Sequence, residues 1–209
     1  MYNDSIHEEK YLGKTIKLFL DEASESPRDW DNLCTLLGVH QRLNIFDEEM
    51  PTAGQSGSLE EDFFAYIYDY LEGHDKSWDM LTPKQAERAG NGIRRRYVFT
   101  PYSAYTKGGC ILRVGYAHGW DCGVVGMMFC SRDDIKKAGL QTAKQAMKIM
   151  EAELDEFSQY CNGEVYCYEI TDESGEDVES CGGFLGMDYA LVEARSVIKA
   201  KLSQLELEV

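Results

Sequence analysis

The stretch His118–Gly126 brings together the residue types that could carry chemistry. It holds a histidine, a tryptophan, an aspartate and a cysteine among three glycines. His118, Asp121 and Cys122 are the residue types of a base, an orienting acid and a thiol nucleophile. Such groups normally come from separate elements of a fold, so their adjacency gives little support for a catalytic triad. The glycines and the apolar residues after them favour a structured loop that leads into a buried strand, with Trp120 in a rigid corner.

Neither a metal site nor a phosphate loop is predicted here. The glycines lack a following Lys-Ser/Thr pair and precede a predicted strand, whereas a phosphate loop opens a helix. The four histidines of the chain are scattered, and its seven cysteines show no Cys-x-x-Cys spacing, which zinc sites favour. We therefore expect reduced, mostly buried thiols, no cofactor and no catalytic residue.

A second tryptophan–aspartate pair lies in Trp30-Asp31-Asn32. We expect Trp30 to lie in the core or to be half-buried, with Asp31 and Asn32 hydrogen-bonded to the backbone of their loop. If Trp120-Asp121 binds a ligand, Asp31 and Asn32 are expected beside it. Three further candidate binding residues are His40, Arg42 and Tyr105.

The net charge of −16 is concentrated at the two ends of the chain. Residues 164–209 hold three basic and eleven acidic side chains, whereas residues 97–131 hold two and one. Such a field repels nucleic acid and anionic membranes and attracts basic protein surfaces. The alternative, that the acid only keeps the protein soluble, stays open. The late acidic candidates are Asp172, Glu173, Glu176, Asp177 and Glu179.

The one basic cluster is Arg94-Arg95-Arg96. It could bind a phosphate or an acidic partner, but in so acidic a chain we expect the arginines to pair with its own carboxylates at the start of an edge strand. No apolar run approaches the roughly 18 residues of a membrane span, and the first residues do not resemble a secretory signal. The expectation is a cytoplasmic protein of the host cell that contacts neither nucleic acid nor membrane; a homodimer is left open.

Period-two alternation and helical spacing predict the secondary structure. The predicted strands cover residues 15–20, 32–40, 97–106, 110–117, 124–130, 164–170 and 178–185. Ser58 and Glu61 predict a capping box for a helix that ends at Gly73. Further helices are predicted from Thr82 to Gly90-Asn91-Gly92, from Ser131 to Asn162-Gly163, and over 188–203.

Strands that cluster in the middle and in a late hairpin favour an α+β fold. We expect a central, mostly antiparallel β-sheet with the late β-hairpin, packed by three to four helices. Residues 1–209 are predicted to form a single domain. Two points are left open: a flexible segment at residues 1–10 and an insertion at 73–95.

Three pieces of the chain resemble a family of uncharacterised proteins encoded by bacteriophages and integrative mobile elements of Gram-positive bacteria. These pieces are Pro27–Leu33 with His40-x-Arg42, Pro101–Tyr105 with Trp120-Asp121-x-Gly123, and Glu153–Tyr168 with Ser180-Cys181-x-Gly183-Phe184. The chain departs from the family pattern at Cys34, at Gly182, and at Thr106-Lys107, where the family has an acid and a histidine. The resemblance implies a setting, an accessory gene of a phage or mobile element, and no known activity.

Charge and setting together favour a non-enzymatic binding protein that inhibits a host nucleic-acid-handling defence system. Its partner would be a host protein with a basic surface, and its carboxylates could stand where phosphates are expected, as in an anti-restriction or anti-CRISPR DNA mimic. Two alternatives stay open: an enzyme acting on a small molecule or nucleotide through the Asp31 and Asp121 loops, and a structural or assembly protein of the phage particle.

Overall fold

The computed structural model describes residues 5–39, 45–117 and 119–207. They form two compact units. The terminal unit combines Met1–Asp29 with Glu156–Val209, and the central unit is Trp30–Asp155. The prediction of a single domain therefore stays open, and the single central sheet is corrected to two sheets, one in each unit.

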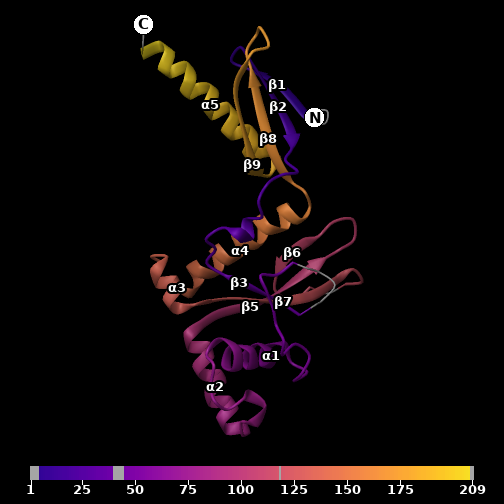
Figure 1. The fold of residues 1–209 in the computed structure, drawn as a ribbon, viewed down its shortest axis with the longest axis vertical. Coiled ribbons are helices and arrows are strands. Elements are labelled where there is room, and N and C mark those ends of the chain that lie inside the picture. Colours follow the sequence, from indigo (N-terminus) through magenta and orange to yellow (C-terminus); the bar gives the residue numbers. More distant parts are fainter. Residues whose placement is uncertain (1–4, 40–44, 118, 208–209) are drawn as a thin grey trace. The chain divides into compact units, whose positions relative to one another are not determined.

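The terminal unit is an antiparallel sheet with the order β1-β2-β8-β9 and a long helix, α5 (Figure 1). Its elements are β1 (His7–Tyr11), β2 (Lys14–Leu20), β8 (Val165–Thr171), β9 (Asp177–Leu185) and α5 (Met187–Leu207). Ile16 and Leu18 alternate onto one face of β2 and lie opposite Ile170 and Tyr168 of β8. This apolar face is buried by Ala190, Leu191, Ala194 and Ile198 of α5. The period-two pattern therefore creates the apolar face against which α5 packs. The late β8–β9 hairpin is confirmed.

The central unit contains a second sheet with the order β4-β3-β7-β5-β6, antiparallel except for the β3–β4 pair. Its strands are β3 (Thr35–Gly38), β4 (Glu48–Glu49), β5 (Tyr97–Tyr105), β6 (Ile111–Val114) and β7 (Cys122–Ser131). Its helical segments are α1 (Leu59–Tyr66), η2 (Ile67–Leu71), η3 (Trp78–Met80), α2 (Pro83–Arg96), α3 (Arg132–Lys137) and the part of α4 (Ala143–Cys161) before residue 156.

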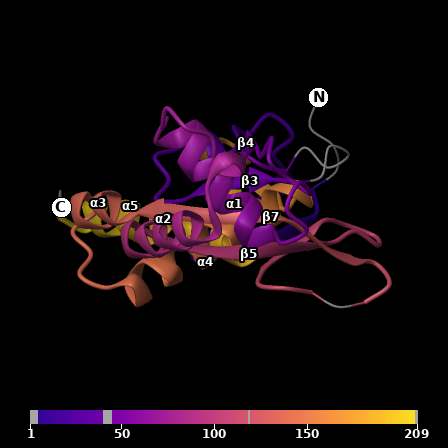
Figure 2. The same cartoon turned by 90° about the horizontal axis from the view of Figure 1, so that it is seen from below.

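The β7 strand is buried on both faces. Met127 and Phe129 pack into a cluster with Phe63 of α1, whereas Cys130 contacts Met150 of α4 at 3.7 Å. Figure 1 shows α1 and α4 on opposite faces of this sheet, and Figure 2 shows α1 lying across the strands. The α+β class with mostly antiparallel sheets is confirmed, and the described residues include four helices of seven residues or more.

Two predicted helices differ from those observed. The helix from Thr82 continues through Gly90-Asn91-Gly92 to Arg96, because Ile93 is buried in the core and Gly90 lets the helix approach the Phe64 ring. The long helix from Ser131 is two helices. Ser131 caps only α3, with its hydroxyl accepting from the Asp134 amide, and Gly139 ends that helix region with a φ of +74°, a conformation that favours glycine.

One glycine of the opening stretch, Gly126, serves a close backbone approach. A Cβ on Gly126 would lie 1.8 Å from the Leu37 carbonyl oxygen and 2.6 Å from the Tyr102 ring. Gly126 therefore allows β7 to pair with β3 while Tyr102 packs over it. The prediction that this stretch feeds a buried strand is confirmed, since Val125 to Cys130 are buried.

Candidate binding groove

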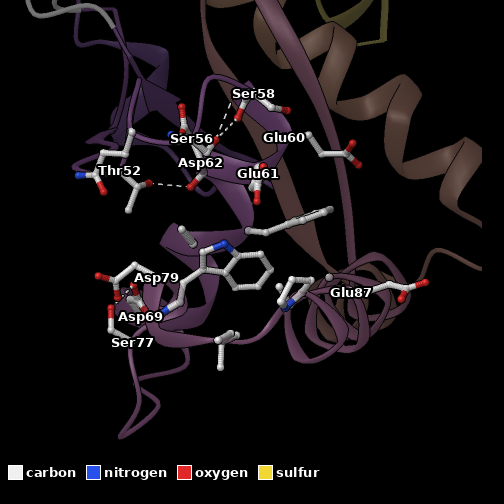
Figure 3. Close-up of a pocket in the computed structure, with 18 of the residues that line it drawn as sticks. Thr52, Ser56, Ser58, Glu60, Glu61, Asp62, Asp69, Ser77, Asp79 and Glu87 are labelled. Carbon is white, nitrogen blue, oxygen red and sulfur yellow. Dashed lines mark hydrogen bonds between the residues drawn. The ribbon is translucent and has the colours of Figure 1, made fainter.

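The central unit contains a groove of about 790 Å³ beside α1 and α2. Three aromatic side chains, Phe64, Tyr70 and Trp78, contribute to its lining. Arg94 is the one cationic side chain among the described lining residues. Figure 3 shows acidic side chains on several sides of the hollow. The six carboxylates are Glu60, Glu61, Asp62, Asp69, Asp79 and Glu87.

Asp62 holds one wall of the groove in place. Its side chain is buried in α1, and its carboxylate accepts hydrogen bonds from the Gly54 amide at 2.6 Å, the Ser56 amide at 2.8 Å and the Ser56 hydroxyl at 2.7 Å. Thr52 donates to the Asp62 carbonyl oxygen at 2.6 Å. The expected capping box at Ser58 is wrong in this respect: Ser58 occupies the N-cap without a side-chain bond, and Asp62 organises the preceding loop instead.

A π-helical turn forms the next part of the wall. The Glu72 amide donates to the Ile67 carbonyl at 2.8 Å, so the hydrogen-bonded ring of η2 encloses one residue more than that of the α-helix that it extends. Asp69 lies in this turn and accepts from the Trp78 amide at 2.8 Å and from the Ser77 hydroxyl at 3.1 Å. The two bonds hold the backbone that carries Trp78, whose ring packs edge-on against Tyr68 at 5.7 Å.

Arg94 enters the groove from α2. Its guanidinium lies 4.7 Å from the centroid of the Phe64 ring and 3.1 Å from the Glu60 carboxylate. The expectation that the basic cluster pairs with the chain's own acids is confirmed for Arg94 and Arg96, because Arg96 likewise bonds Glu72 at 2.7 Å. The arginines, however, end a helix and do not begin an edge strand.

Three of the six carboxylates are left for a ligand. Asp62 and Asp69 accept backbone amides, and Glu60 pairs with Arg94. Glu61, Asp79 and Glu87 form no hydrogen bond or ion pair within the described part of the chain. Acids and aromatic rings around a hollow suit a cationic ligand. No group of three His, Cys, Asp or Glu side chains among the described residues could hold a metal ion.

The Trp30-Asp31-Asn32 segment is a surface turn outside this groove. The Asn32 amide and side-chain nitrogen both donate to the Trp30 carbonyl, at 3.0 and 2.9 Å, which confirms the predicted role of Asn32. Glu153 of α4 accepts from the Leu33 amide at 2.6 Å and the Cys34 amide at 3.0 Å. Asp31 is exposed. Trp30 is also exposed, at 49%, so the expectation that it lies in the core or is half-buried is wrong.

The Trp120 ring is fully exposed, so the expected rigid corner is wrong for this side chain. Asp121 instead lies 3.8 Å from the Lys107 ammonium, and its carbonyl accepts from the Thr106 amide. Tyr105 and Cys122 face each other in the register of β5 and β7 and line a separate hollow of about 510 Å³. Its described lining residues fall within 103–122, so Asp31 and Asn32 are not among them.

The late acidic candidates lie in the terminal unit. Asp172 organises the β8–β9 turn, since its carboxylate accepts from the Ser174 amide at 2.8 Å, the Ser174 hydroxyl at 2.6 Å and the Glu176 amide at 3.0 Å. These hydrogen bonds, led by that from the Ser174 hydroxyl, lower the pKa of Asp172. Glu179 bonds Lys201 at 2.8 Å. Glu173, Glu176 and Asp177 are exposed.

Three residues singled out from the sequence, His40, Arg42 and His118, lie outside the described residues. The groove itself was missed. Its sequence signal was the run Glu60-Glu61-Asp62 followed by Trp78, and the segment 73–95, taken as an insertion, supplies part of its lining. All seven cysteines are free as expected, but only Cys34 and Cys130 are buried. Burial raises the pKa of the Cys130 thiol to about 11.

Comparisons with protein-family models, with curated proteins and with solved structures found no match. Among the described helices, none combines the length and the apolar character that crossing a bilayer requires.

Proposed function

We propose that this chain is an accessory protein of a phage or mobile element that binds a basic surface of a host protein. By doing so it inhibits a complex that handles nucleic acid in host defence, in the manner of an anti-restriction or anti-CRISPR protein. In this role the chain acts by binding, without a cofactor or a catalytic group, and its carboxylates take the place of phosphates.

The observation that supports this proposal best is the groove beside α1 and α2. Six carboxylates and a single guanidinium line it, on a chain whose net charge is −16. A hollow of this kind concentrates positive charge and disfavours nucleic acid itself. The local charge therefore supports the same partner class as the total charge does, a basic protein surface.

The setting rests on a different kind of support. It comes from the resemblance of Pro27–Leu33, Pro101–Tyr105 and Glu153–Tyr168 to proteins of phages and mobile elements. The groove residues lie outside these three pieces. The setting and the binding role can consequently fail independently, and each needs its own test.

The binding role is tested by co-purification from host cells at low and at high salt. We expect recovery of a nucleic-acid-binding protein at low salt and its release at high salt, because ionic strength screens charge attraction between surfaces. Immobilised duplex DNA should not retain the chain. Recovery of no nucleic-acid-binding protein, or retention on DNA, would contradict the proposal.

The two alternatives have tests of their own. An enzyme that uses Asp31 and Asp121 should lose its activity, and little stability, when both are replaced by alanine. Asp121 lies 3.8 Å from the Lys107 ammonium, and this ion pair gives no support to a catalytic role for Asp121. A structural protein of the particle should co-purify with virions, whereas an inhibitor is expected to stay outside them.

A further inference from the structure

The groove already contains one example of the chemistry that it can bind. The Arg94 guanidinium lies over the Phe64 ring at 4.7 Å, and its nitrogens approach the Glu60 carboxylate at 3.1 and 3.2 Å. An aromatic face below and a carboxylate at the edge satisfy both the plane and the N–H groups of a guanidinium. Arg94 therefore shows which ligand geometry these walls support.

The same two kinds of group remain available elsewhere in the groove. Tyr70 is 60% exposed although its ring stacks on Tyr66 at 6.0 Å, so part of its aromatic surface is open. The carboxylates of Glu61 and Glu87 belong to α1 and α2 and have no partner within the described chain. Figure 3 shows Glu61 and Glu87 on different sides of the hollow, with Asp79 on a third.

We propose that the groove binds an arginine side chain from a basic segment of the partner protein. Its guanidinium lies against the aromatic surface of Tyr70 and Trp78, and the negative charge of Glu61, Asp79 and Glu87 around the hollow attracts it. This inference rests on the proposed binding role and specifies its ligand. Arginine is favoured over lysine because a planar, weakly hydrated guanidinium stacks on aromatic rings, whereas an ammonium keeps its water.

The experiment uses the full chain and two labelled peptides that are identical except that one carries arginines and the other lysines. Fluorescence anisotropy at moderate salt measures the two dissociation constants. We expect roughly fivefold tighter binding of the arginine peptide, the range of an added stacking contact. Tyr70→Leu removes the exposed Tyr70 part of the aromatic surface, leaves Trp78 in place, and should reduce this preference to about twofold.

Charge is tested with a matched pair of double variants. Glu61→Gln with Glu87→Gln removes two carboxylates from the groove, and should weaken arginine-peptide binding about tenfold. Glu173→Gln with Glu176→Gln removes the same charge from the β8–β9 turn, and should weaken it by less than about twofold. Melting curves establish that each variant is folded.

Three results would overturn the inference: no binding of the arginine peptide, equal affinity for both peptides, or equal effects of the two double variants. In each case co-purification can still recover a nucleic-acid-binding protein through another surface, which would leave the proposed function standing. Conversely, arginine-selective binding without such a partner would support the ligand and refute the inhibitory role.

Discussion

Replacing Asp62 by alanine should destabilise the central unit far more than replacing the neighbouring Glu61 does. The Asp62 side chain is 3% exposed and accepts three hydrogen bonds from the 52–58 loop. A hydrogen bond to a charged group contributes about 1.5–3 kcal/mol. Two of the donors are backbone amides near the surface that water can rehydrate, so we take about 1 kcal/mol for each bond and expect a loss of about 3 kcal/mol.

The assay is urea and thermal unfolding of the purified variants. A loss of about 3 kcal/mol should lower the melting temperature by roughly 10 °C in a domain of this size. Glu61→Ala is the matched control, since Glu61 is exposed on the same turn of α1 and should change stability by less than about 0.5 kcal/mol. Limited proteolysis should cut the Asp62→Ala variant first within residues 51–58.

Equal stability of the Asp62→Ala and Glu61→Ala variants would refute this reasoning. It would mean that the loop is fixed by its own backbone contacts and that the buried carboxylate contributes nothing net. Asp62→Asn separates charge from shape, because the amide keeps the volume and one acceptor oxygen. We expect it to fall between the wild type and the alanine variant.

Three further predictions concern other parts of the chain. Gly126→Ala should cost about 3 kcal/mol or more by denaturant unfolding, whereas Gly123→Ala, with no atom within 4 Å of the added Cβ, should not. The Arg195 guanidinium lowers the pKa of Glu9. This pair therefore stabilises the fold above the unfolded-state pKa of Glu9, and the stabilisation is lost as pH falls through its lower folded pKa. On acid titration, the Glu9→Gln variant should lose less unfolding free energy than the wild type. Cys130 should resist alkylation at pH 8 while the exposed Cys181 reacts, because a thiol with a raised pKa forms little thiolate.

Local pattern predicted elements well where one face of an element is buried. Ile16 and Leu18 alternate with polar residues, and the same alternation in 164–170 predicts a strand. In the structure the apolar faces of both strands pack against α5. Alternation shows which face of a strand is buried but not which strands pair. It therefore could not predict that β2 pairs with β8 and not with the middle strands. The sequence therefore predicts one sheet where the structure has two.

The groove was less predictable for a physical reason. Its walls depend on contacts between segments, such as Asp62 with the loop before α1, and on a π-helical turn at Ile67–Leu71. Helical spacing continues smoothly through Phe63, Ile67 and Leu71 in the sequence, so no pattern marks the change of pitch. From the sequence alone, carboxylates in such a segment indicate a solvated helix face. Only the three-dimensional structure shows that aromatic residues lie opposite them.

The pairing of β2 with β8 has a consequence for how the protein is made. The β1–β2 hairpin leaves the ribosome well before its partner strand β8, because β3 to β7 and α1 to α4 lie between them in the sequence. Until β8 is synthesised, the hairpin presents an unpaired edge and the bare side chains of Ile16 and Leu18. Its alternating charges, such as Glu8 opposite Lys17, would discourage association with other nascent chains during that interval. The charged side chains of this hairpin would thus limit aggregation of the nascent chain before the fold is complete.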